Sequence, residues 1–332
     1  MAGSGTAQLR PDDPDIILRV ENLVMEFPAG KGRVVHAVSD LSFDIREGET
    51  LGLVGESGCG KSTTAKALVQ LPPPTSGTIS YQGRDLTALK GEELRRMRPE
   101  IQMIFQDPVS SLNPRRKVFD IVSEGVQVWG GRKGGGFSED RIVDIIRDVG
   151  LDPEVARSKR PHEYSGGQCQ RISVARALVL DPKIVICDEP VSALDVSVQA
   201  QVLNMLEDMK ARYGLTLVFI SHDLSVVKNI SDRVAVMYLG KLCELGDGDL
   251  LYDEPAHPYT RLLLAAVPDP ENKHAANTEV LEGELPSPIN PPSGCRFRTR
   301  CPRAEAICAE VEPTVQQVGD RDHWVACHFP YV

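Results

Sequence analysis

The stretch Gly55-Glu-Ser-Gly-Cys-Gly-Lys-Ser62 decides the fold of this 332-residue chain. It matches the phosphate-binding pattern G-x-x-x-x-G-K-[ST] at every fixed position. The apolar run at 49–54 before it predicts a short buried strand, and the run at 63–69 after it predicts a helix. A strand, a glycine-rich loop and a helix in this order are the context in which the pattern binds nucleotide phosphates.

Each residue type in this loop has a chemical task. Glycines let the backbone curl so that N–H groups point at phosphate oxygens, and the helix start adds the positive end of its dipole. Lys61 can reach the β- and γ-phosphates, and the hydroxyl of Ser62 can bind Mg²⁺. A chance glycine-rich turn is the alternative, which the Lys-Ser ending and the flanking runs disfavour. The predicted nucleotide-binding residues here are Gly55, Glu56, Ser57, Gly58, Cys59, Gly60, Lys61, Ser62 and Thr63.

Composition limits the possible classes of protein. Hydrophobic residues make up 41% of the chain, and the net charge of −10 argues against a general nucleic-acid binder. No apolar run reaches the ~18 residues that a membrane-spanning helix needs, and the first residues lack a signal-peptide pattern. We therefore expect a cytoplasmic chain whose eight cysteines are reduced or metal-bound.

Two further apolar runs, at 183–187 and 215–220, predict central parallel strands joined by a helix at 198–212. Asp188 ends the first of these strands and can hold Mg²⁺ through water, while the neighbouring Glu189 can polarise an attacking water as a general base. The alternative is that two carboxylates merely end a strand at the solvent edge. The phosphate-binding loop upstream favours the catalytic interpretation.

A second loop suited to phosphate lies at Ser165-Gly-Gly-Gln168, just before a predicted helix. One chain does not need two such loops for a single nucleotide. We infer that this loop serves ATP bound to another subunit.

Ser165, Gly166, Gly167 and Gln168 resemble the signature loop of the ATP-binding cassette (ABC) ATPases, and other elements of that family follow the same order in this chain. The resemblance implies that Gln106 is the Q-loop glutamine, which helps to hold Mg²⁺ with Ser62 and Asp188. It also implies that Asp195 belongs to the D-loop and that His222 is the catalytic switch histidine. Phe27 is an aromatic residue that could stack on adenine.

Longer stretches resemble the peptide and nickel importer branch of this family. They are the run from Phe105 to Arg115 and the motif His257-Pro-Tyr-Thr260. The segments 165–171, 187–195 and 226–233 are most similar to the second ATPase subunit of oligopeptide and dipeptide importers. Import of nickel, glutathione or another small solute is the first alternative. A soluble ABC ATPase that acts on nucleic acid is the second, although it would call for a second cassette or a coiled coil, and a basic face.

The resemblance also implies an architecture and a set of partners. We expect an α/β P-loop NTPase fold with a mostly parallel core sheet, an antiparallel β side-sheet and an inserted helical subdomain near 98–165. The cassette would span 15–267, between a flexible tail at 1–14 and a proline-rich linker with a cysteine-rich extension at 268–332. The expected partners are a second, different ATPase subunit, two transmembrane permease subunits and an extracytoplasmic solute-binding protein, with no nucleic acid. The chain would then lie at the cytoplasmic face of the cell membrane.

Four cysteines cluster in the extension, and Pro302 follows one of them. A [4Fe–4S] cluster uses four thiolates at varied spacing and is carried by similar extensions in peptide-importer ATPases. Zn²⁺ is an alternative, although zinc sites favour closer cysteine pairs, and free thiols are another. Because the linker intervenes, we expect such a centre to lie outside the ATP site. The candidate ligands are Cys295, Cys301, Cys308 and Cys327.

Overall fold

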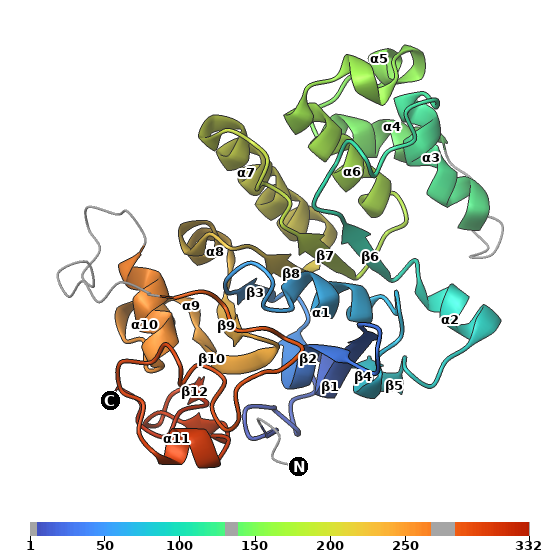
Figure 1. The fold of residues 1–332 in the computed structure, drawn as a ribbon. Helices are drawn as coiled ribbons and strands as arrows, with labels where there is room; N and C mark the ends of the chain where they lie inside the picture. Colours follow the sequence, from blue (N-terminus) through green and yellow to red (C-terminus); the bar gives the residue numbers. More distant parts are fainter. Residues whose placement is uncertain (1–4, 130–138, 267–282, 332) are drawn as a thin grey trace. The chain divides into compact units, whose positions relative to one another are not determined.

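The computed structural model describes residues 5–129, 139–266 and 283–331. The chain divides into two compact units (Figure 1). The first combines residues 1–89 with 220–332, and the second consists of residues 90–219. The carboxyl-terminal extension therefore belongs to the same unit as the glycine-rich loop.

The first unit contains the glycine-rich loop, an antiparallel sheet and the C-terminal extension. Its elements are β1 (Ile16–Pro28), β2 (Val34–Arg46), β3 (Thr50–Val54), α1 (Lys61–Leu68), β4 (Ser76–Tyr81), β5 (Arg84–Asp85), α8 (Leu224–Ile230), β9 (Arg233–Tyr238), β10 (Lys241–Asp247), α9 (Gly248–Asp253), α10 (Pro258–Ala265), α11 (Ile307–Glu310), β11 (Gln316–Gln317) and β12 (His323–Val325).

Two groups of strands build the first unit. The side-sheet has the order β2-β1-β4-β5 and is antiparallel throughout. The strands β11, β12, β10, β9 and β3 adjoin in that order, and β9 is parallel to β3. All five residues of β3 are buried. Gly52 permits a close covering helix, since a Cβ there would lie 2.4 Å from the Cγ1 of Val227 in α8.

The second unit consists of helices and three adjoining strands. The strand order is β8-β7-β6, with β6 and β7 parallel. Its elements are α2 (Gly91–Met97), β6 (Ile101–Ile104), α3 (Val118–Trp129), α4 (Glu139–Asp148), α5 (Pro153–Ser158), a 3₁₀ turn (Pro161–Glu163), α6 (Gly166–Leu178), β7 (Ile184–Asp188), α7 (Val196–Tyr213) and β8 (Thr216–Ile220), whose last residue is already assigned to the first unit.

The predicted α/β class is confirmed, with parallel pairing among the buried strands and an antiparallel side-sheet. Helices α3, α4 and α5 fall within the range 98–165, where we expected an inserted helical subdomain. The exact bounds of that subdomain and of the cassette stay predictions. Most of the linker, at 267–282, lies outside the described residues.

The prediction of a loose tail at 1–14 is wrong around Gln8 and Arg10, while residues 1–4 lie outside the described part. The Gln8 side chain is buried, and its Nε2 donates to the Ser42 carbonyl at 2.8 Å. The Arg10 guanidinium pairs with the buried Asp44 carboxylate at 2.6 Å. Polar side chains hold this segment because they satisfy acceptors buried at β2.

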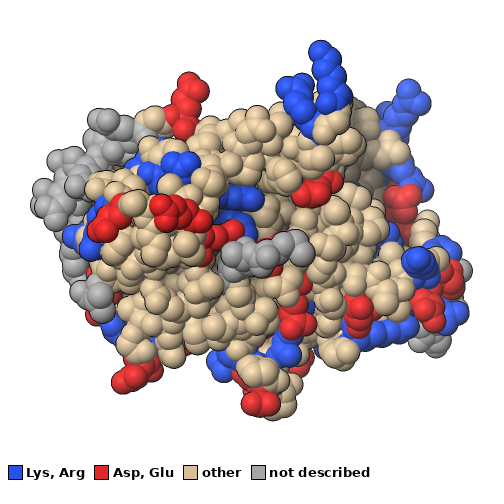
Figure 2. All heavy atoms as spheres, turned by 60° about the horizontal axis from the view of Figure 1, so that its bottom comes forward, with Lys and Arg blue, Asp and Glu red and all other residues tan. Residues whose placement is uncertain are grey.

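The surface carries charges of both signs. On the face drawn in Figure 2, Lys and Arg side chains are interspersed with Asp and Glu, and the described residues there form no continuous basic stripe. Within the described ranges, no helix has both the length and the apolar character needed to cross a bilayer.

Candidate functional site

The glycine-rich loop connects β3 to α1 and needs glycine at both of its ends. Gly55 has φ +148°, and a Cβ there would lie 2.1 Å from the Met237 carbonyl oxygen. Gly60 has φ +109°, and its Cβ would lie 2.4 Å from the Ala37 carbonyl oxygen. Any side chain at either position would collide with backbone, so the loop can close tightly only with glycine.

Lys61 folds back across this loop. Its side chain is buried, and its Nζ donates to the carbonyl oxygens of Gly55 at 2.7 Å and Glu56 at 3.1 Å. Ser62 and Thr63 are half-buried in the first turn of α1. Burial raises the pKa of the Cys59 thiol, although Lys61 opposes the shift, so this cysteine stays uncharged inside the loop.

These features fit the phosphates of a nucleotide. The loop places a lysine ammonium beside a tight backbone turn, and eight-residue α1 begins directly after that turn. The ammonium can exchange its two carbonyl partners for phosphate oxygens, and the Ser62 hydroxyl is of the chemical type that Mg²⁺ binds.

Two other predicted residues belong to the first unit. Phe27 is half-buried on β1, paired with Val35 of β2. His222 is exposed between β8 and α8, next to Asp223, whose carboxylate caps α8 by accepting from the Ser225 amide at 2.9 Å. Their roles toward a nucleotide stay predictions.

In the second unit, three predicted residues lie at or just beyond the ends of β6 and β7. Asp188 is 3% exposed at the end of β7. Glu189 follows it with φ +47°, a left-handed conformation that is uncommon for a residue other than glycine. The Gln106 amide, just beyond β6, donates to the Glu189 carboxylate at 3.0 Å. The parallel pairing of the two strands brings these residues together although 83 positions separate them.

The second predicted phosphate loop forms the start of α6. Ser165 caps the helix by accepting from the Gln168 amide at 3.3 Å, and the Gln168 side chain accepts from the Ser165 amide at 2.9 Å. Gly167 is buried, and a Cβ there would lie 2.4 Å from the Cγ1 of Val198 on α7. Ser165, Gly166 and Gln168 are exposed, so their polar groups are available to a ligand outside the unit.

Asp195 caps α7 in a similar way. Its carboxylate accepts from the Val198 amide at 3.0 Å and from the Ser197 hydroxyl at 2.7 Å. The Ser197 hydrogen bond, followed by that of Val198, lowers the pKa of Asp195, which therefore stays ionised.

Two residues that sequence reasoning did not assign to the site contact the phosphate-binding loop. The Tyr259 hydroxyl accepts a hydrogen bond from the Glu56 amide at 2.9 Å. The Arg300 guanidinium donates to both carboxylate oxygens of Glu56, at 2.7 and 3.0 Å. The extension therefore reaches the phosphate-binding loop through Arg300, while the expectation that a cysteine-bound centre lies outside the ATP site stays a prediction. Tyr259 lies in a motif that the sequence singled out, whereas no local pattern marks Arg300.

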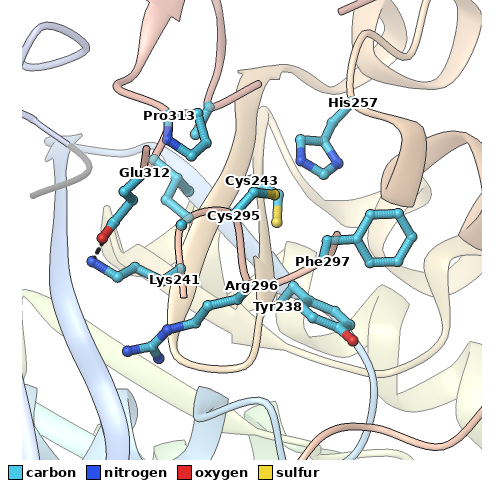
Figure 3. Close-up of a pocket in the computed structure, with 12 residues that line it drawn as sticks. Tyr238, Lys241, Cys243, His257, Cys295, Arg296, Phe297, Glu312 and Pro313 are labelled. Carbon is cyan, nitrogen blue, oxygen red and sulfur yellow. Dashed lines mark ion pairs between the residues drawn. The ribbon is translucent and has the colours of Figure 1, made fainter. Parts of the chain in front are cut away.

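The extension also encloses a pocket against β10 (Figure 3). Cys243 of β10 and Cys295 of the extension both line it, beside His257 and Phe297. On another side of the pocket, Lys241 and Glu312 form an ion pair at 2.5 Å. The pocket thus lies between the extension and the hairpin of β9 and β10.

The four predicted cysteine ligands lie in this extension, and none of these four described residues forms a disulfide bond. Burial raises the pKa of Cys295 to about 11 and that of Cys327 to about 12; Cys301 and Cys308 add to both shifts, and Cys295 adds to that of Cys327. These thiols are therefore close enough for the charge of one to affect the pKa of another. Even so, among the described residues no group of three or more His, Cys, Asp or Glu side chains is arranged to hold a metal ion. The iron–sulfur or zinc centre therefore stays a prediction.

Comparison with known families gives two matches. The family described as "ABC transporter" matches residues 38–192. The family described as "Oligopeptide/dipeptide transporter, C-terminal region" matches residues 243–308, which include part of the cysteine-rich extension.

Known proteins match over nearly the whole chain. The oligopeptide transport ATP-binding protein OppF of Salmonella typhimurium is 49% identical over 322 residues, which cover 94% of this chain and 96% of that protein. The putative oligopeptide transport ATP-binding protein YkfD of Bacillus subtilis is 50% identical over 314 residues, with 94% and 95% covered.

Solved structures match the cassette. A dimeric ATP-binding cassette in a post-hydrolysis state, bound to ADP and Pi, has a TM-score of 0.63 and 25% identity, with 70% of this chain and 98% of that chain covered. The protein cbiO1 from Clostridium perfringens, part of the ABC transporter complex cbiONQ, has a TM-score of 0.62 and 28% identity, with 72% and 92% covered.

Proposed function

The chain belongs to the ATP-binding subunits of oligopeptide ABC transporters, and from this membership we propose that it hydrolyses ATP to drive the import of short peptides. The observation that carries the proposal is the loop of Gly55 to Gly60 with Lys61 folded across it. That arrangement is built for a nucleoside triphosphate, and the similarity along the whole chain supports the transport role.

Each part of the site has a proposed task. Lys61 and the amides of its loop hold the phosphates, and Ser62, Asp188 and Gln106 hold Mg²⁺. Bound MgATP supplies the phosphoanhydride bond whose hydrolysis is coupled to transport. Glu189 accepts a proton from the attacking water, and its hydrogen bond to Gln106 orients the carboxylate. The switch histidine, His222, and the adenine-stacking residue, Phe27, complete the set.

The exposed signature loop supports a paired arrangement of ATPases. Ser165, Gly166 and Gln168 present polar groups at the start of α6 and face outward. We assign them to ATP held by a second, different ATPase subunit, with Asp195 in the same contact. This chain would then supply one phosphate-binding loop and one signature loop to a head-to-tail pair.

The remaining proposed partners are two transmembrane permease subunits and an extracytoplasmic solute-binding protein. The chain would bind the permeases peripherally at the cytoplasmic face of the membrane. The residues beside Gln106 suit this contact, since Phe105 is 38% exposed and Val109 is 54% exposed. Large apolar side chains at the surface are typical of protein interfaces.

We keep the [4Fe–4S] cluster of the extension as a proposal. Its support is the set of four cysteines within one short segment, in which the Cys295 amide donates to the Cys308 carbonyl at 2.8 Å. A thiolate set of this kind suits iron–sulfur ligation, and Zn²⁺ would use the same donors. No step of ATP hydrolysis is assigned to the centre.

Reconstitution tests the proposed function. The chain is assembled with its second ATPase and permeases in lipid vesicles, and ATP-dependent uptake of labelled di- to pentapeptides is measured with the solute-binding protein present. We expect uptake that Lys61→Ala abolishes. Uptake of Ni²⁺ or glutathione without peptide uptake would identify the alternative cargo, and ATP hydrolysis stimulated by nucleic acid rather than by the permeases would contradict a transport role.

A further inference from the structure

We propose that Arg300 positions the phosphate-binding loop and neutralises Glu56, so that the C-terminal extension sets the affinity of the loop for ATP. The inference rests on ATP binding by the loop and does not depend on the cargo. It makes Arg300 a positioning residue, since the group it contacts is the Glu56 carboxylate.

Glu56 is held at three atoms. Its amide donates to the Tyr259 hydroxyl, and its carbonyl oxygen accepts from Lys61 Nζ. Its carboxylate receives two parallel hydrogen bonds from Arg300. A bidentate arginine–carboxylate pair fixes direction as well as distance. The second residue of the loop therefore contacts both the phosphate-binding Lys61 and the extension.

Arg300 is itself fixed. Its side chain is only 5% exposed, and its Nη1 lies 3.4 Å from the Tyr238 hydroxyl. The ring of Tyr238 packs edge-on against Tyr259, at 4.8 Å between centroids, and against Phe297, at 5.1 Å. The Tyr259 hydroxyl and the Arg300 guanidinium, which both contact Glu56, thus belong to or contact one aromatic cluster.

The segment before Arg300 is anchored beside the same loop. The Pro288 carbonyl accepts from the His36 amide at 2.9 Å, on β2. Arg296 donates to the Ser39 hydroxyl at 2.9 Å and to the Leu239 carbonyl. Arg300 therefore reaches Glu56 from a segment attached at several points, and the contact does not depend on one long side chain alone.

The sign of the effect follows from charge. The Glu56 carboxylate belongs to a loop that must accept the negative triphosphate. Where water is partly excluded, charges a few ångströms apart interact strongly, so the carboxylate would repel the triphosphate and is attracted to Arg300. The positive charge of Arg300 neutralises the negative charge of this carboxylate. If Arg300 were uncharged, Glu56 would repel ATP, and removal of the Glu56 charge would restore binding.

The test measures ATP binding to the full-length chain by titration calorimetry, for wild type, Arg300→Met, Glu56→Gln and the double variant. We expect Arg300→Met to raise the Kd for ATP about tenfold at low salt, and less at high salt, where charge is screened. Glu56→Gln should bind at least as well as wild type. The double variant should return to within about twofold of wild type, because neither charge remains. Arg298→Met is the matched control, because Arg298 donates to the Ser293 carbonyl of its own segment.

Three results would overturn the proposal: a folded Arg300→Met protein with wild-type affinity, a double variant as weak as Arg300→Met, or a Glu56→Gln protein that binds ATP poorly. The last two results would show that the Arg300–Glu56 contact only holds the loop in place and that neutralisation of the Glu56 charge does not matter. Glu56→Gln keeps the test decisive if Arg300→Met fails to fold. Failure of the underlying site is distinguishable, because then wild type and Lys61→Ala would both fail to bind ATP.

Discussion

The side-chain amide of Gln106 donates a hydrogen bond to the carboxylate of Glu189, with 3.0 Å between Nε2 and Oε2. The two residues follow the parallel strands β6 and β7. Because Glu189 also has a left-handed backbone, its carboxylate is held in one direction by its main chain and by its partner. A fixed carboxylate of this kind suits a base that must meet a water molecule in one orientation.

Glu189→Gln should preserve this geometry and remove the base. The amide oxygen of glutamine can still accept from Gln106, so the pair should remain. We expect ATP binding to stay within about twofold of wild type while turnover of the assembled transporter falls by about 10²-fold, the range for loss of a general base. Steady-state phosphate release and nucleotide binding measure the two effects. Hydrolysis near the wild-type rate would remove Glu189 from the role of base.

Ser165→Arg should affect a site other than the one that contains Lys61. The arginine would remove the helix cap and place a bulky side chain where the signature loop meets the partner's nucleotide. We expect ATP binding to the isolated chain to be unchanged, while the partner's site in the assembled complex loses activity.

Ser165→Asn is the matched control, since asparagine also caps helices. The control is needed because the loss of a helix cap alone lowers protein stability by about 1 kcal/mol. The asparagine variant should keep most of the activity. Full activity of a strictly monomeric chain would contradict the need for a second subunit.

The sequence was sufficient wherever function depends on residues close together in the chain. The loop around Lys61 and the signature around Ser165 are continuous motifs, and their local structure follows from glycine, a helix start and a cap. The position of Glu189 beside Gln106 could not be read in this way, because no strand was expected before Gln106; the parallel pairing of β6 with β7 brings the two residues to one edge.

Contacts that arise only from tertiary packing could not be predicted. Arg300 and Glu56 are 244 positions apart, and neither belongs to a periodic pattern that relates them. Gln8 looked like part of a polar tail, yet it is buried because it satisfies the Ser42 carbonyl. The proline-rich linker suggested separation, but the extension after it returns to the same unit as the loop.

The cysteines of the extension give a prediction with a visible result. Anaerobically purified protein should be brown and contain about four iron and four sulfide per chain, as a four-iron cluster with four thiolate ligands requires. Cys308→Ser and Cys327→Ser should each lose the colour and the iron. The matched controls are Cys169→Ala and Cys187→Ala, at buried cysteines of the second unit. Stoichiometric zinc without sulfide would support the zinc alternative, and the absence of both metals would leave free thiols.

The stability of the first unit should fall in mild acid because of His257. Burial lowers its pKa to about 4, although Glu244 opposes the shift, and its Nδ1 accepts from the Tyr259 amide at 3.0 Å at the start of α10. The buried Glu244 carboxylate also accepts from the His257 amide and contacts His323. His257 is therefore neutral in the folded protein and takes up a proton near pH 6.5 only when unfolded.

The sign follows from linkage. Between about pH 6.5 and pH 4 the unfolded chain binds more protons at this residue, so the free energy of unfolding decreases as the pH falls, by about 3 kcal/mol in total. His257→Asn retains a side-chain acceptor at the start of α10 but cannot titrate, so its stability should depend less on pH across this window. Urea unfolding followed by Trp324 fluorescence, in a Trp129→Phe background, reports on the first unit. The control is His162→Asn, at an exposed histidine of the second unit, which should keep the wild-type slope. An equal slope in wild type and His257→Asn would show that protonation of His257 does not set acid stability.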